Sequence, residues 1–178
     1  MTTIWTTSDT HFGHKNIISH ADRPFDSVEE MDEALIDNWN ATVSRDDEVW
    51  FLGDFSFSKF ARTVEIFERL KGQIHLVRGN HDDKKVRGLP WASVTDLTEL
   101  RFGGHKFVLC HYPLEVWNNA HHGAIHLHGH SHGTGRIAPR RMDVGVDCVD
   151  GYKPIALEQI IAEMADDAFI AADHHGAE

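Results

Sequence analysis

The sequence contains few cysteines, few basic residues and no long apolar run. Its two cysteines, Cys110 and Cys148, lie far apart and form no CxxC pair, so we interpret them as small residues inside strands and expect a cytoplasmic protein. No stretch approaches the ~20 apolar residues that a membrane span needs. The first five residues have neither a basic region nor a long apolar stretch, so we expect no signal peptide.

The shortage of basic residues limits the partners. With 17 lysines and arginines against 28 acidic residues, the formal net charge is −11. Such a chain is not expected to follow a long nucleic acid by neutralising its phosphates. A site that held two divalent cations would nevertheless be locally positive, so a small phosphorylated substrate is the expected partner.

The length and composition are those of a globular domain, with 178 residues of which 41% are hydrophobic and 25% charged. No repeat or Pro/Ser-rich linker divides the chain, so we expect a single domain over residues 1–172 and a flexible tail over 173–178. Apolar runs predict strands over residues 4–7, 48–52, 73–77, 95–102, 106–110, 124–128 and 142–146.

Helices are predicted over residues 27–43, 58–71 and 154–172. Ser27 and Glu30 form a capping box at the start of the first, and Gly72 marks the end of the second. The expected buried residues are Phe60, Val64, Phe67 and Leu70 in the second helix and Ile155, Ile160, Ile161 and Met164 in the third. Gly103-Gly104 predicts a hairpin turn. The order of elements favours an α/β fold with mixed sheets and helices outside them.

Five short polar clusters are the most informative feature, because each follows a predicted strand. They are Asp9-Thr10-His11, Gly53-Asp54, Gly79-Asn80-His81-Asp82, His111 and Gly129-His130-Ser131-His132. Together they supply carboxylates, a carboxamide and imidazoles, which suit borderline divalent metals. Because open α/β folds place their sites at the carboxyl ends of strands, we expect the clusters to converge at one sheet edge.

The spacing within the clusters supports a metal centre. A lone histidine at a strand end is usually a surface residue, and a lone Gly-Asp is usually a turn; five clusters in order are not explained in this way. Asp9 and His11 are two residues apart, so in an extended backbone their side chains leave on the same side. His130 and His132 repeat this spacing, and Gly129 lets the backbone come close.

The order Asp-x-His, Gly-Asp, Gly-Asn-His-Asp, His and Gly-His-x-His resembles the calcineurin-like metallophosphoesterase superfamily. The resemblance implies an α/β fold of two mixed β-sheets packed as a sandwich and flanked by helices, a four-layer αββα arrangement with a dinuclear metal centre at the sheet edge. Matched by position, one metal would be held by Asp9, His11, Asp54 and His132, and the other by Asp54, Asn80, His111 and His130. Asp54 would bridge the metals, and His81 would be the catalytic residue.

The same resemblance implies hydrolysis of a phosphoester by a hydroxide that bridges two divalent metal ions. Manganese is favoured, and iron, zinc, nickel or cobalt would also suit the ligands. Gly53-Asp54 is followed by Phe55-Ser56-Phe57 in place of the acid-and-arginine turn of the Ser/Thr protein phosphatases, so protein phosphatase activity is not expected. The motif around Asp9 and the motif around His130 are similar to those of small single-domain bacterial and phage phosphoesterases.

We therefore expect a phosphodiesterase that acts on small diesters. The alternative is a phosphomonoesterase acting on a nucleotide or another small phosphorylated metabolite. A non-catalytic scaffold and a DNA-repair nuclease are less favoured, because every ligand position is filled and the chain has no room for capping regions. The loops over 12–25 and 117–123 are expected to select the substrate. The sequence leaves open the oligomeric state and the roles of His14, Arg23, Asp82, His121, His122 and His128.

Overall fold

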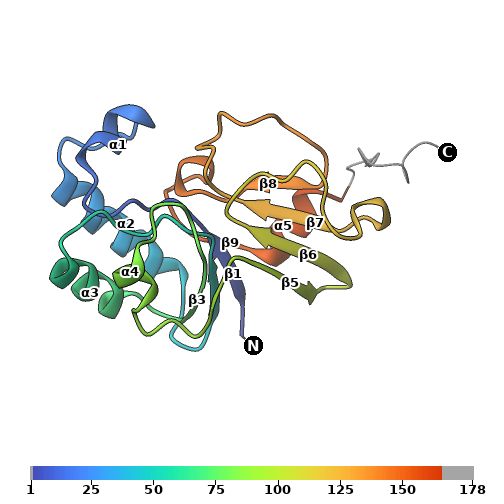
Figure 1. Cartoon of the computed structure of the whole chain (residues 1–178), viewed down its shortest axis with the longest axis horizontal. Coiled ribbons are helices and arrows are strands. Elements are labelled where there is room, and N and C mark those ends of the chain that lie inside the picture. Colours follow the sequence, from blue (N-terminus) through green and yellow to red (C-terminus); the bar gives the residue numbers. More distant parts are fainter. Residues whose placement is uncertain (1, 166–178) are drawn as a thin grey trace.

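The computed structural model describes residues 2–165 of the chain and shows two mixed β-sheets (Figure 1). In the first sheet, four parallel strands and one antiparallel edge strand follow the order β4-β3-β2-β1-β9. Their bounds are β1 (Ile4–Thr7), β2 (Glu48–Phe51), β3 (Gln73–Val77), β4 (Val94–Thr95) and β9 (Ile155–Ala156). The predicted strands at 4–7 and 73–77 are confirmed with their limits, and the one at 48–52 ends a residue early.

The second sheet has the order β5-β6-β7-β8. Its strands are β5 (Leu97–Phe102), β6 (His105–Cys110), β7 (Ile125–His128) and β8 (Arg141–Asp143). The hairpin between β5 and β6 is confirmed. Gly103 and Gly104 both have positive φ, 55° and 82°, as a two-residue turn that follows the twist of the strands requires. β6, β7 and β8 then run parallel.

Helices lie outside the sheets, as the α/β sandwich requires (Figure 1). They are α1 (Lys15–His20), α2 (Val28–Thr42), α3 (Phe60–Arg69), α4 (Lys84–Arg87), α5 (Leu157–Glu163) and the 3₁₀ helices η1 (Ala120–His122) and η2 (Val146–Cys148). The Ser27 half of the capping box at α2 is confirmed: Ser27 Oγ accepts from the N–H of Glu30 at 3.1 Å. The Glu30 carboxylate accepts from the N–H of Asp26 at 2.8 Å, one residue before the N–H that a capping box uses.

Alternation along β2 divides the interior into two apolar cores. Val49 and Phe51 face the core that the first sheet shares with α2 and α3. Leu52, just past the strand, belongs to the core between the two sheets, which α5 completes with Leu157 and Ile160. The segment around η1 covers the outer face of the second sheet in a third, smaller cluster.

Within residues 2–165, no helix is long and apolar enough to cross a lipid bilayer.

The buried face of α3 differs from the prediction. Phe60 is 45% exposed, while Thr63 and Ile66 are buried. The reason is a polar contact: Thr63 Oγ1 lies 3.0 Å from Ser56 Oγ, and this hydrogen bond turns Thr63 inward. Val64 and Phe67 are partly buried, and Leu70 is buried as expected.

Other boundaries also need correction. Thr95, predicted to begin the hairpin, pairs with β3 in the first sheet. The predicted strand 142–146 stops at Asp143, and Cys148 lies in η2 instead of a strand, whereas Cys110 is buried in β6 as expected. Ile155 is in β9, so the last helix begins at Leu157. This helix ends at Glu163, short of the predicted limit at residue 172. Residues 166–172 of the predicted helix and the predicted tail over 173–178 lie outside the described residues, and the single domain stays a prediction.

Candidate metal centre

The five polar clusters follow the carboxyl ends of β1, β2, β3, β6 and β7, and the structure brings them together. One group contains Asp9, His11 and His132, with one ligand atom of each within 4.8 Å of the others. A second group contains Asp54, His111 and His130 and meets the same limit. The first sheet thus contributes the carboxylates and the second sheet most of the imidazoles. Their convergence at one edge agrees with the prediction.

The first group contains buried polar atoms that need a partner. Oδ1 of Asp9 and both ring nitrogens of His11 are buried and have no hydrogen-bond partner within residues 2–165. His11 Nε2 lies 3.6 Å from Asp9 Oδ1 and 3.7 Å from Asp54 Oδ2. A buried polar group without a partner costs about 1–3 kcal/mol. A divalent cation between this imidazole and these carboxylates would satisfy them, so the residues fit a metal.

The second group is oriented by the backbone. Nδ1 of His111 lies 2.7 Å from the carbonyl oxygen of Leu52, to which it donates, so Nε2 turns toward the centre. This Nε2 lies 3.0 Å from Oδ1 of Asn80 and 3.5 Å from Oδ2 of Asp54. Asn80 therefore joins the second group, as predicted. Burial alone would raise the pKa of Asp54, but His111, the N–H of His81 and His11 together outweigh burial and lower this pKa below its usual range.

Asp54 connects the two groups. Its Oδ2 is 3.7 Å from Nε2 of His11 and 3.5 Å from Nε2 of His111. Its other oxygen, Oδ1, accepts from the backbone N–H of His81 at 2.9 Å. One carboxylate oxygen thus faces both imidazoles, which is the arrangement expected of a side chain shared by two cations.

The backbone of the site is left-handed, contrary to the extended conformation predicted. Five of the seven candidate ligands have positive φ: Asp9 (57°), His11 (50°), Asp54 (62°), His130 (67°) and His132 (46°). Side chains two residues apart therefore converge because the chain turns sharply after each strand. Such conformations are unfavourable for residues with a Cβ and gather at functional sites. A Cβ on Gly129 would collide with Ser8 and with the Asp9 carboxylate, so the predicted close approach is confirmed.

Asp147 is a supporting residue that the sequence interpretation missed. Its Oδ2 accepts from Nδ1 of His132 at 2.7 Å, and its carboxylate pairs with Nε of Arg23 at 2.7 Å. Burial would lower the pKa of His132, but the carboxylates of Asp147 and Asp9 together outweigh burial and raise it. One signal was available: Asp147 follows β8, a parallel neighbour of β7, just as the recognised clusters follow their own strands.

Arg23 and Asp82 also hold the centre in place. The role of Arg23, which the sequence left open, is structural: its side chain is buried, at 4% exposed. It donates to the backbone carbonyls of Asp9 and Thr10 at 2.7 and 2.9 Å, which fixes the first cluster.

Asp82 is buried and accepts from the N–H groups of Asp54, Phe55 and Gly79 at 2.8–2.9 Å. Its carboxylate therefore shapes the turn that carries Asp54.

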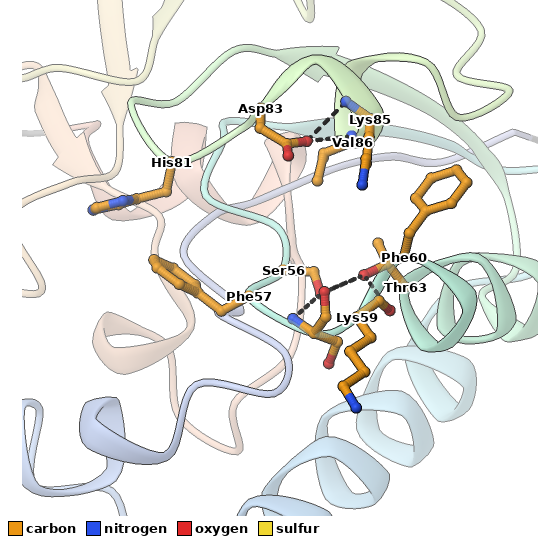
Figure 2. Close-up of a pocket in the computed structure, with 10 residues that line it drawn as sticks. Ser56, Phe57, Lys59, Phe60, Thr63, His81, Asp83, Lys85 and Val86 are labelled. Carbon is orange, nitrogen blue, oxygen red and sulfur yellow. Dashed lines mark hydrogen bonds between the residues drawn. The ribbon is translucent and has the colours of Figure 1, made fainter.

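His81 lies at the open side of the centre. Its side chain is 47% exposed, and Nε2 is 4.0 Å from Asp54 Oδ2. The ring of Phe57 lies beside it, with ring centroids 4.8 Å apart (Figure 2). Phe57 also stacks on His14, with ring centroids 4.2 Å apart. The pKa of His14 is lowered, first by burial and then by the nearby His11. Phe57 therefore contacts both His14 and the candidate catalytic residue His81. The sequence did not reveal this role of Phe57.

The remaining histidines lie apart from the two groups. His128 is buried beside His126 and bonds the carbonyl of Gly129 through Nδ1 at 2.8 Å. The rings of His121 and His122, in η1, are tilted at 49° to each other with their centroids 4.1 Å apart. His122 lies beside Gly104 and Lys106, at the start of β6, whereas His111 follows its end. His122, whose role the sequence left open, therefore lies at the end of β6 away from the metal centre.

Comparison with known proteins agrees with the geometry. A family model for the calcineurin-like phosphoesterase superfamily domain matches residues 3–142. An uncharacterized protein of Methanocaldococcus jannaschii is 39% identical over 171 residues, covering 90% of this chain and 90% of that protein. The gene 66 protein of Mycobacterium phage L5 is 30% identical over 182 residues, covering 83% of this chain and 87% of that protein.

A solved structure shares the fold. A protein of unknown function from Aquifex aeolicus matches with a TM-score of 0.75 and 23% identity, covering 92% of this chain and 100% of that one. Its likeness agrees with the two-sheet architecture flanked by helices. The family match spans all five polar clusters. The chain therefore belongs to the calcineurin-like phosphoesterase superfamily, a family of metal-dependent phosphoesterases.

Proposed function

We propose that the protein is a phosphodiesterase that hydrolyses small diesters with a pair of divalent cations. The observation that carries this proposal is the position of Asp54 Oδ2, 3.7 Å from His11 Nε2 and 3.5 Å from His111 Nε2. A single carboxylate oxygen between two ligand groups favours two adjacent metals over one. The buried, unpartnered atoms of Asp9 and His11 support the same conclusion.

Seven side chains would hold the two ions, with Asp54 shared. One ion would bind Asp9, His11, Asp54 and His132; the other would bind Asp54, Asn80, His111 and His130. When bound, such ions lower the pKa of water toward neutrality and neutralise charge on the phosphoryl oxygens. Mixed imidazole, carboxylate and carboxamide ligands favour manganese, and they would also accept iron, zinc, nickel or cobalt.

The protein's own residues position the reaction. Asp147 and the Leu52 carbonyl fix the imidazoles of His132 and His111. During hydrolysis, a water molecule gives up a proton to solvent and its oxygen forms a bond to phosphorus, while the bond from phosphorus to the leaving oxygen breaks and that leaving oxygen takes a proton. His81 is the proposed donor of this proton, because its exposed imidazole stands beside Asp54 and outside the ligand groups.

The arginines near the centre favour a diester over a monoester. Arg23 is occupied by Asp147 and by two backbone carbonyls. Arg78 pairs with Asp96 at 2.7 Å. The buried Arg23 guanidinium is therefore not available for the extra negative charge of a phosphomonoester, which bidentate arginines usually bind, whereas the exposed pair with Asp96 holds Arg78 only weakly. Two free cysteines are typical of a reducing compartment, so we place this activity in the cytoplasm.

The test is a matrix of metals and substrates on the chelator-stripped protein. Manganese-loaded protein is expected to hydrolyse bis-p-nitrophenyl phosphate faster than p-nitrophenyl phosphate, with cyclic nucleotides included as further diesters. A strong preference for the monoester would overturn the choice of diester and favour the phosphomonoesterase. Turnover of neither substrate with any of the five metals would instead favour a non-catalytic scaffold.

A further inference from the structure

A cavity of about 330 Å³ adjoins the metal centre at His81. It lies between the turn that begins α4 and the segment from Ser56 to the first turn of α3 (Figure 2). Its volume is at the lower end of those of small-molecule sites. Neither of the loops expected to select the substrate, 12–25 and 117–123, contributes a residue to its lining.

The two ends of the cavity differ chemically. His81 and Phe57 stand at one end, next to the metal centre, and Lys85 and Phe60 stand at the other (Figure 2). Phe60 is 45% exposed and stacks on no aromatic ring within residues 2–165. The far end of the cavity therefore offers a free aromatic surface beside an ammonium group.

The charge of this end is positive. Lys85 forms no ion pair in the described part of the chain. Asp83, the acid that also lines the cavity, uses Oδ1 to accept from the N–H groups of Lys85 and Val86 at 2.8 and 2.9 Å. Lys59 also lines the cavity, so two ammonium groups stand against one carboxylate in its lining, in a chain with a net charge of −11. An anionic group is therefore the complementary occupant.

We propose that this cavity binds the leaving group of the substrate, and that the leaving group carries a planar ring and a second anionic substituent. The proposal rests on the proposed function, because it places the scissile phosphorus at the metal centre. The leaving oxygen would lie at His81, the ring beside Phe57 and Phe60, and the phosphate or carboxylate substituent at Lys85. Lys85 and Phe60 are then the residues that determine specificity.

The test compares two diesters that share one chromophore. Methyl p-nitrophenyl phosphate has a neutral leaving group, and its analogue with a carboxylate next to the nitro group has an anionic one. The ratio of kcat/KM, anionic over neutral, is expected to fall about fivefold in Lys85→Ala, as for a partly exposed ion pair. Lys84→Ala, which removes the same charge from the same turn outside the cavity, should leave the ratio unchanged. Raising the salt concentration should lower the ratio for wild type and for Lys84→Ala, and should have little effect on the ratio for Lys85→Ala.

The aromatic wall is tested with the same pair. Phe60→Leu keeps an apolar side chain but removes the flat surface, so it should lower kcat/KM for both diesters by raising KM. An unchanged ratio in Lys85→Ala, or an equal fall in Lys84→Ala, would overturn the subsite while leaving the proposed function intact.

A binding measurement needs no turnover and separates the two proposals. The carboxylated nitrophenol product alone is titrated into the protein and followed by amide NMR. Saturable shifts at Phe60 and Lys85, weakened in Lys85→Ala, would support the subsite even if neither diester were hydrolysed and the proposed function failed. Absence of shifts at these residues would overturn it.

Discussion

Asp147 Oδ2 accepts a 2.7 Å hydrogen bond from Nδ1 of His132, and this bond turns Nε2 of the imidazole toward Asp9 Oδ1, 3.9 Å away. The same carboxylate pairs with the buried Arg23, which in turn holds the backbone carbonyls of Asp9 and Thr10. Asp147 therefore connects the two clusters that build the first ligand group, although it is not a candidate ligand itself.

The first prediction concerns Asp147→Asn. The carboxamide retains a weak acceptor for His132 but loses the charge that fixes its tautomer and neutralises Arg23. Residues that support a metal ligand in this way contribute about 10–100-fold in metal affinity, so the manganese affinity should fall by that order. Calorimetric titration of the stripped protein measures it. Asp150→Asn, an exposed neighbour, is the control. An unchanged affinity in Asp147→Asn would show that the bond has no role in metal binding.

The second prediction counts metal ions. After dialysis against manganese, wild type should hold two ions per chain by elemental analysis. His132→Ala removes a ligand of one ion only and should retain the other. Asp54→Ala removes the shared carboxylate and should retain less metal than His132→Ala. His122→Ala controls for adventitious binding, because His122 is exposed and distant from both groups. If Asp54→Ala still held two ions, the proposal that the two ions share the Asp54 carboxylate would be wrong.

The third prediction concerns the proton donor. His81→Ala should retain metal, since the side chain is 47% exposed and outside both ligand groups. Turnover of diesters with poorly acidic leaving alcohols should fall about 10²–10⁴-fold, and that of p-nitrophenyl diesters much less, because a good leaving group needs no proton. The dependence of kcat on leaving-group pKa measures the difference. Loss of metal in His81→Ala would contradict the assignment.

Much of the site was predictable because its signals are local. Apolar runs that end in Asp9, Asp54 and His111 predict strands that deliver polar residues to one sheet edge, and the structure brings these residues together. The capping box at Ser27 is likewise a pattern within one turn of chain. Such signals need no knowledge of tertiary contacts.

The rest depends on contacts between distant residues. Arg23 and Asp147 are 124 residues apart, so neither shows its partner in the sequence. The prediction of the buried face of α3 was wrong because hydrophobic periodicity places Phe60 on that face. In the structure, a hydrogen bond to Ser56 turns Thr63 toward the interior instead. Left-handed φ at His11 and His132 is also invisible, because histidine has no strong preference for it and the surrounding contacts impose it.

The fourth prediction concerns pH and the loop that carries His11. Asp32, on α2, is 4% exposed, and its Oδ1 accepts from the N–H of Gly13 at 2.9 Å. Burial raises its pKa to about 6, although the Gly13 N–H and Arg62 oppose the shift. The folded state therefore binds this proton more tightly than the unfolded state, whose pKa is 3.8. The stabilisation from this proton is complete below about pH 4 and is lost as pH rises through about 6.

Asp32→Asn keeps an oxygen for the Gly13 N–H and cannot ionise. The free energy of unfolding of this variant, relative to wild type, should therefore rise between about pH 4 and about pH 7, by an amount of order 2 kcal/mol. Urea unfolding of stripped protein across this range measures the difference, and Asp37→Asn, on an exposed position of the same helix, should show none. A difference that stays constant with pH would mean that Asp32 is already ionised at low pH, and that the loop carrying His11 is held by a charged carboxylate.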